Sequence, residues 1–262
     1  TLLADLTLDE LSSWRSEQFK RLSVRGGLHG NVALDDAEAL ADLLITLLPM
    51  DRVALSRPAV TQLTESMDID LAVDHNDAAL LLYVQDPDDS FASRAKSALA
   101  GQLLRSPFFS SLRTDQQLGY VVSAGIRRMD TQSGNLFLVQ SPSAGVGHIE
   151  NAVIEFLQDY LAQWDAMTEA AFEQQKAGLM TRLLEKDKNL YQRSQRYWQN
   201  LAEENYRFDT NQQIAELVNA LTKAEMKAFL EDMTERAVNR RLLIFSDGAF
   251  KAAERAATAS AS

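Results

Sequence analysis

The chain has 262 residues, of which 46% are apolar and 24% are charged, and it contains no cysteine. Its 26 Lys and Arg residues against 37 Asp and Glu residues give a formal net charge of −11, which disfavours binding to a phosphate backbone. The absence of cysteine excludes disulfides, thiolate zinc sites and cysteine nucleophiles. No run of about 18 apolar residues occurs, so the sequence predicts no membrane-spanning helix.

A repeated pattern is found near the beginning and near the end of the chain. Thr7–Glu10 and Thr222–Glu225 both read Thr-x-x-Glu, the capping box in which two side chains satisfy the first free amides of a helix. A β-like segment follows each predicted helix, at 24–32 and at 241–246. We interpret the repeat as one domain ending that occurs twice, with chance similarity of two capped helices as the alternative. Residues 1–52 are therefore expected to be the tail of a preceding homologous α+β domain.

Residues 53–248 are predicted to form one complete α+β domain. The elements expected in chain order are strands at 68–73 and 78–85 around a polar turn, a helix capped by 88–90 that runs to about residue 104 and is interrupted by Pro107, a short helix at 108–117, a hairpin of strands 120–129 and 135–141 with the loop 130–134, helices at 149–164, 168–186 and 190–203, and a strand at 241–246. This order suits a mainly antiparallel sheet with helices packed on one face. Residues 249–262, rich in Ala and Ser, are expected to be a flexible tail.

The most specific sequence pattern lies at residues 106–142. Its core, Leu-Arg-Thr-Asp-Gln-Gln-Leu-Gly-Tyr at 112–120, resembles a hallmark of the last of four homologous domains in the insulinase/pitrilysin family. The resemblance covers nearly the whole chain in order. Further similar segments are Leu28–Val32, which resembles the end of the third domain, and Gly125–Arg128, Phe137–Ser141, Met167–Phe172 and Tyr206–Asp209.

The resemblance implies the carboxy-terminal half of a zinc metalloendopeptidase, in which two halves enclose a chamber for peptides. In that family an inverted His-x-x-Glu-His motif of the first half holds the zinc. This chain departs from the motif, because its only histidines are His29, His75 and His148, and no two of them lie four residues apart. His148 and Glu150 are two residues apart, so their side chains diverge on a helix. We therefore expect no metal and no independent activity in this chain, with Zn²⁺ in an amino-terminal half of the same enzyme as its partner.

The resemblance also implies the site residues. Arg113 and Tyr120 match positions at which family members hold substrate, and they are expected to be the catalytic residues of this half, as donors to the substrate and to an oxyanion. Phe109 matches an aromatic position near the substrate and completes the substrate-binding set. Gly119 is expected to let the chain turn from helix into strand without a side-chain clash. The residues alone allow a structural alternative, with Arg113 paired to a surface carboxylate and Tyr120 an ordinary sheet residue.

Two functions from different classes stay open at this point. The first is a substrate-binding, non-catalytic part of a peptidase, with peptides as ligands and with neither nucleic acid nor membrane as a partner. The second is a catalytically inactive binding or assembly subunit of the same fold. The resemblance favours the periplasm as the compartment, and the cytoplasm is left open.

Overall fold

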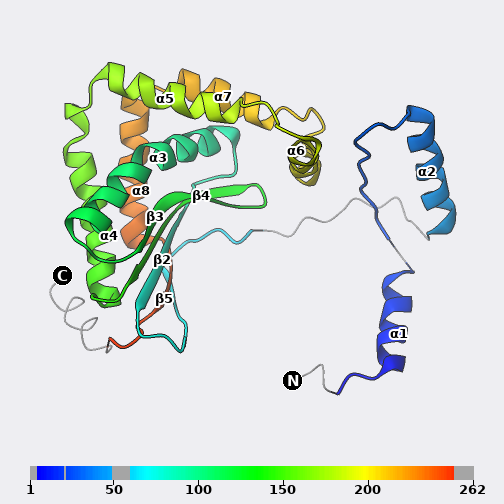
Figure 1. The fold of residues 1–262 in the computed structure, drawn as a ribbon, viewed down its shortest axis with the longest axis horizontal. Coiled ribbons are helices and arrows are strands. Elements are labelled where there is room, and N and C mark those ends of the chain that lie inside the picture. Colours follow the sequence, from blue (N-terminus) through cyan, green and yellow to red (C-terminus); the bar gives the residue numbers. More distant parts are fainter. Residues whose placement is uncertain (1–4, 21, 49–59, 251–262) are drawn as a thin grey trace. The chain divides into compact units, whose positions relative to one another are not determined.

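The computed structural model describes residues 5–20, 22–48 and 60–250 (Figure 1). The chain divides into two compact units: a smaller unit of residues 1–59 with 187–208, and a larger unit of residues 60–186 with 209–262. The predicted domain boundary at 52/53 lies outside the described residues. The predicted tail at 249–262 also lies outside them, except for Ala249 and Phe250.

The larger unit is built on one five-stranded sheet. Its strands are β1 (Met67–Asp70), β2 (Ala78–Gln85), β3 (Val121–Met129), β4 (Gln132–Ser141) and β5 (Leu242–Ser246). Their spatial order is β1-β5-β2-β4-β3, and every neighbouring pair is antiparallel except β1 with β5, which is parallel. The α+β prediction is confirmed, although the sheet is mixed. The last strand lies between β1 and β2, which the sequence had suggested only as two strands around a turn.

The larger unit has five α-helices among its described residues. They are α3 (Phe91–Phe109), α4 (Val146–Ala162), α5 (Glu169–Leu183), α7 (Thr210–Ala220) and α8 (Lys223–Asn239), and α7 had not been predicted. A π-helical turn, Ser110–Asp115, follows α3, and a 3-10 turn, Trp164–Ala166, follows α4. None of the described helices is both long enough and apolar enough to cross a bilayer.

The core lies between one face of the sheet and the helices α3, α4 and α8 (Figure 1). Side chains alternate between the two faces of a strand, and Leu82, Phe137 and Leu243, which are opposite one another in register, are fully buried on the helix side. Their neighbours Leu81 and Leu138 face the other side and are only half-buried. Burying each large apolar side chain contributes about 1.5–3 kcal/mol to the free energy of unfolding. Because the large apolar side chains lie on one face of the sheet, the helices pack on that face, as the sequence predicted.

Helix α3 does not stop at Pro107, which corrects the predicted interruption. A proline inside a helix leaves the carbonyl four residues earlier without its amide partner. Here that carbonyl belongs to Leu103, and the Tyr160 hydroxyl of α4 donates a hydrogen bond to it at 3.5 Å. Phe108, the next residue, is fully buried in the core. Tertiary contacts on both sides of Pro107 therefore let the helix continue to Phe109.

The β3–β4 hairpin is confirmed, but its predicted loop of residues 130–134 is too long. The strands close with Met129 opposite Gln132, which leaves only Asp130 and Thr131 in the turn. Gly134 lies within β4, and a Cβ at this position would meet the carbonyl oxygen of Val84 at 2.4 Å. A glycine in a strand can mark such a close backbone approach rather than a loop.

The smaller unit contains α1 (Leu8–Gln18), α2 (Leu34–Leu47) and α6 (Leu190–Ala202). The sequence predicted α1 and α6 but not α2. The strand predicted at 24–32 is wrong: this segment is irregular in the structure. Within the described part of the unit no sheet edge is present to pair with it, and an extended segment gains its backbone hydrogen bonds only from a neighbouring strand.

Both predicted capping boxes are confirmed. The Thr7 hydroxyl accepts from the amide of Glu10 at 3.3 Å, and the Glu10 carboxylate accepts from the amide of Thr7 at 2.8 Å. At α8 the Thr222 hydroxyl accepts from Glu225 at 3.2 Å, and the Glu225 carboxylate accepts from Thr222 at 2.9 Å. Each box satisfies two of the free amides with which a helix begins.

A buried carboxylate lies where β2 ends. Asp86 is only 2% exposed, its Oδ1 accepts a hydrogen bond from Ser97, and its Oδ2 has no partner among the described residues. Burial raises the pKa of Asp86 to about 6, and the Ser97 hydrogen bond and the charge of Arg236 oppose this shift only in part. Ionising Asp86 therefore costs folding free energy.

We predict that the contribution of Asp86 to stability falls as the pH rises from about 4 to about 6. Because the folded pKa of Asp86 lies above the ordinary aspartate value of 3.8, the folded state binds the proton more tightly, and this contribution is present below about pH 4 and lost through about pH 6. A rise of the pKa from 3.8 to about 6 corresponds to roughly 3 kcal/mol. In urea unfolding across this range, Asp86→Asn should flatten the profile, whereas Asp115→Asn, at an exposed carboxylate, should not. A variant profile as steep as that of the wild type would contradict the assignment.

Candidate functional site

The three predicted site residues lie around the turn that joins α3 to β3. After Phe109 the helix widens into the π-helical turn, in which the amide of Gln116 donates to the Ser111 carbonyl at 3.0 Å. The amide of Leu118 then donates to the Leu112 carbonyl at 2.9 Å. Leu112 and Leu118 are both buried, so they anchor the turn to the core. Single π-helical turns are often found at functional sites.

Gly119 is the residue that lets the turn enter the sheet. A Cβ built there would lie 1.9 Å from the carbonyl oxygen of Gln140 on β4, a distance that no side chain tolerates. Glycine is required at position 119 because of this close approach, and not because of a positive φ. Gln117, two residues earlier, does have a positive φ of 54°, a conformation that is uncommon outside glycine. The backbone conformation at 117–119 therefore fixes the position of Tyr120 at the end of the turn.

The structure brings Phe109, Arg113 and Tyr120 together. The guanidinium carbon of Arg113 is 5.3 Å from the ring centroid of Phe109 and 5.4 Å from that of Tyr120. The Nη1 of Arg113 also donates a hydrogen bond to the backbone carbonyl of Tyr120. Such cation–π contacts are worth about 0.5–1 kcal/mol each at exposed sites. We call these three residues the aromatic–guanidinium cluster.

The aromatic–guanidinium cluster is open to solvent. The side chain of Tyr120 is 82% exposed, that of Phe109 is 44% exposed, and Arg113 is half-buried between them. Among the described residues, the Tyr120 hydroxyl has no hydrogen-bond partner and Arg113 has no ion pair with Asp115. Four of the five guanidinium N–H donors and one phenol O–H are thus available to a ligand, and carbonyl or carboxylate oxygens are the groups that accept from them.

The three histidines do not form a metal site. His75 Nδ1 accepts from the amide of Asp77 in an exposed turn, and His148 lies on the exposed side of α4. His29 belongs to the smaller unit. The Glu150 carboxylate accepts from Arg241. Across residues 5–20, 22–48 and 60–250 no group of three or more His, Asp or Glu side chains is placed to hold an ion.

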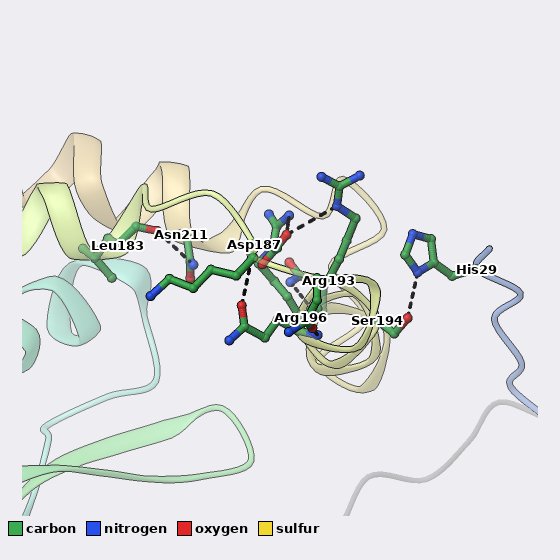
Figure 2. Close-up of polar contacts among 11 residues, drawn as sticks. His29, Leu183, Asp187, Arg193, Ser194, Arg196 and Asn211 are labelled. Carbon is green, nitrogen blue, oxygen red and sulfur yellow. Dashed lines mark hydrogen bonds and ion pairs between the residues drawn. The ribbon is translucent and has the colours of Figure 1, made fainter. Parts of the chain in front are cut away.

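The smaller unit contains a pocket that the sequence did not predict. Its volume is about 750 Å³, and its wall is formed by residues 26–29 and by α6. His29 Nδ1 lies 2.7 Å from Ser194 Oγ (Figure 2), and the His29 ring meets Tyr197 edge-on at 4.9 Å. Nearby on α6, Arg196 binds Asp187. The only signal in the sequence is the helical spacing of Tyr191, Ser194 and Trp198 on one side of α6.

Comparisons with known proteins agree with the fold. Residues 99–198, which include the aromatic–guanidinium cluster, match the family model for "PQQ synthase PqqF-like, C-terminal lobe domain 4". Insulin-degrading enzyme of Homo sapiens is 29% identical over 241 residues, which are 88% of this chain and 24% of that protein. A nardilysin-like protein of Arabidopsis thaliana is 27% identical over 237 residues, covering 86% and 23%.

The similarity extends to a solved structure. The crystal structure of pitrilysin matches with a TM-score of 0.78 and 25% identity, over 96% of this chain and 27% of that chain. The chain thus spans about a quarter of the length of the curated relatives that it matches. In sequence and in fold, the chain is similar to a carboxy-terminal part of the insulinase-family peptidases.

Proposed function

We propose that this chain is the substrate-binding, non-catalytic carboxy-terminal portion of a zinc metalloendopeptidase that cleaves peptides in an enclosed chamber. The observation that carries the proposal is the meeting of Phe109, Arg113 and Tyr120 at one exposed turn. The sequence offered these residues as separate candidates up to eleven positions apart. Their convergence is what a shared ligand requires.

The proposed role of Arg113 and Tyr120 is to donate hydrogen bonds to carbonyl oxygens of a bound peptide. The rings of Phe109 and Tyr120 hold the guanidinium, so little side-chain freedom is lost when a ligand binds. Donors fixed in this way also stabilise negative charge that develops on a carbonyl oxygen during amide hydrolysis. We assign Zn²⁺ to an amino-terminal half of the enzyme, because the residues that the structure describes offer no group of donors that fits a metal.

We also propose that residues 1–52 are the tail of a domain homologous to 53–248. The two complete capping boxes at Thr7 and Thr222 support the repeat. Helices α1 and α2 have no buried residue, although both present large apolar side chains. Apolar surfaces of this kind commonly mark contacts with another folded part.

That same exposed surface favours a second function, a catalytically inactive binding or assembly subunit. Leu43, Ile45 and Leu47 on α2 and Trp14 on α1 are all exposed, as expected for a face that docks against a partner. An assembly subunit would need these residues but not the donors of Arg113 and Tyr120. The periplasmic location stays a prediction.

In the assembled enzyme, Tyr120→Phe should lower kcat/KM for a peptide by at least about tenfold, near 1.4 kcal/mol, because it removes one donor and keeps the ring. Arg113→Ala should lower it further, since it removes the other donors as well. Tyr191→Phe, at an exposed tyrosine outside the aromatic–guanidinium cluster, is the matched control. Unchanged turnover in Tyr120→Phe, or a loss of stability in Arg113→Ala as large as its loss of turnover, would favour the structural alternative.

Gly119→Ala should reduce turnover without changing either donor. Its Cβ cannot fit beside the Gln140 carbonyl, so the start of β3 must move and carry Tyr120 away from Arg113. Overpacking of this kind costs about 1–3 kcal/mol of stability. Gly125→Ala, within the strand β3 that follows, is the control, because a Cβ there meets no atom within 4 Å. Equal kcat/KM for the two variants would show that the close approach does not position Tyr120.

Mixing separates the two candidate functions. This chain alone should have no chelator-sensitive peptidase activity, and activity should appear only when it is combined with an amino-terminal half that carries the His-x-x-Glu-His motif. Assays of each part and of the mixture, with the Arg113→Ala chain as a control, measure this directly. An amino-terminal half that is fully active by itself, and unaffected by the added chain, would leave the binding or assembly role as the better explanation.

A further inference from the structure

The pocket of the smaller unit lies between the segment 26–29 and one side of α6. Contacts at both ends hold this segment to the helix. Arg25 Nη1 donates a hydrogen bond to the Leu201 carbonyl at 3.1 Å, and His29 Nδ1 lies 2.7 Å from Ser194 Oγ (Figure 2). The two walls of the pocket are therefore fixed to each other, as in a preformed ligand site.

The size and the charge of the pocket limit what it can bind. Its volume of about 750 Å³ lies within the range of about 300–1,000 Å³ that is typical of small-molecule sites. Gly26 leaves space open, because a Cβ there would meet no atom within 4 Å. Among the described residues, none that lines the pocket is Asp, Glu, Lys or Arg. An ionised ligand would lose its hydration there without gaining a counter-charge, so the lining favours a neutral ligand.

The lining is rich in aromatic rings. Tyr197 meets His29 edge-on on one side and Phe208 on the other, with 5.4 Å between the Tyr197 and Phe208 centroids. Trp198 also lines the pocket, but it is 54% exposed and has no ring partner in the described part of the chain. Aromatic rings attract one another at centroid distances of about 4.5–7 Å, so an aromatic ligand would give Trp198 the partner that it lacks.

His29 supplies a polar group with unused hydrogen-bonding capacity. Its Nδ1 is engaged by Ser194, whereas its Nε2 has no hydrogen-bond partner among the described residues. In a neutral imidazole one nitrogen donates and the other accepts, so Nε2 is a donor in one tautomer and an acceptor in the other. A hydroxyl group both donates and accepts, and it therefore satisfies Nε2 in either tautomer. A carbonyl or an indole N–H suits only one of them.

We propose that the pocket between 26–29 and α6 binds a small neutral phenol, with its ring against Trp198 and its hydroxyl on Nε2 of His29. The site is separate from the aromatic–guanidinium cluster, and the inference does not rest on the proposed function. Because such a ligand touches both walls, it would stabilise the packing of 26–29 on α6 by mass action.

An NMR titration of the whole chain tests this inference through the indole N–H resonance of Trp198. The chain has three tryptophans, and Trp14 and Trp164, which are outside the described lining of the pocket, are internal controls. The probes are phenol, benzene, which has the same ring without the hydroxyl, and benzoate, which adds a charge. We expect a saturable shift of Trp198 with phenol, at a Kd of about 1 mM or tighter. Benzene should bind about fivefold or more weakly, and benzoate should not bind.

A variant assigns the hydroxyl contact to His29. In His29→Ala, phenol and benzene should bind with equal affinity, because the nitrogen that distinguishes them is gone. His75→Ala, at the exposed turn of the larger unit, is the matched control and should keep the difference. A looser segment 26–29 would weaken both ligands alike, so the ratio of the two affinities isolates the hydrogen bond. If His29→Ala does not fold, the comparison of the three probes on the wild type still decides.

Several outcomes would overturn the inference. They are equal affinities for phenol and benzene in the wild type, a difference that survives in His29→Ala, and no shift of Trp198 at about 10 mM phenol. A blocked Gly-Tyr-Gly peptide that binds as tightly as phenol would assign the pocket to a polypeptide instead of a small molecule. Loss of phenol binding in the assembled enzyme, read by saturation transfer to the ligand, would show that another part of the enzyme fills the pocket. None of these results bears on Arg113 and Tyr120.

Discussion

The burial of one sheet face against α3, α4 and α8 is the constraint on which the rest of the larger unit depends. Leu82, Phe137 and Leu243 are directed into this core by the strand register, and the register in turn fixes which residues of β3 face solvent. A slip of one residue would invert every side chain of the hairpin. The hydrophobic core thus determines the position of an exposed candidate site that contributes almost nothing to the core.

The core is connected to the site by a short segment whose conformation is unusual at three successive points. The Tyr160 hydroxyl compensates for Pro107, the helix then widens into a π-helical turn, and Gly119 passes against the Gln140 carbonyl. Buried side chains on either side of each irregularity stabilise it. The aromatic–guanidinium cluster is therefore rigidly supported even though its own rings are exposed, which lowers the entropy lost when a ligand is held.

Much of the fold could be predicted from local patterns, and the errors have tertiary causes. The capping boxes at Thr7 and Thr222 predicted both helix starts, because a cap is complete within four residues. The β-like segments that follow them had different outcomes: 242–246 is a strand because β1 and β2 lie on either side of it, whereas 24–32 has no neighbouring strand in the described part of the smaller unit. Likewise, no local signal at Pro107 could reveal the distant Tyr160. The family motif supplied Phe109, Arg113 and Tyr120, but their contact depends on the π-helical turn, which has no sequence signature.

The charges of the chain bear on which ligands the proposed site would select. The chain carries a net charge of −11, while cationic side chains at Arg113 and Arg127 lie at the two ends of one exposed edge. At physiological ionic strength the electric field of a charge is screened over about 8 Å. An approaching peptide is therefore repelled or attracted by the acidic surface as a whole only at low salt. At higher salt it interacts with the nearby cations only once it is in contact with them. Neutral backbone carbonyls gain from those cations without needing a matching side chain. Recognition through backbone groups is therefore compatible with a strongly acidic protein, because its affinity depends on donors within hydrogen-bond distance and not on net charge.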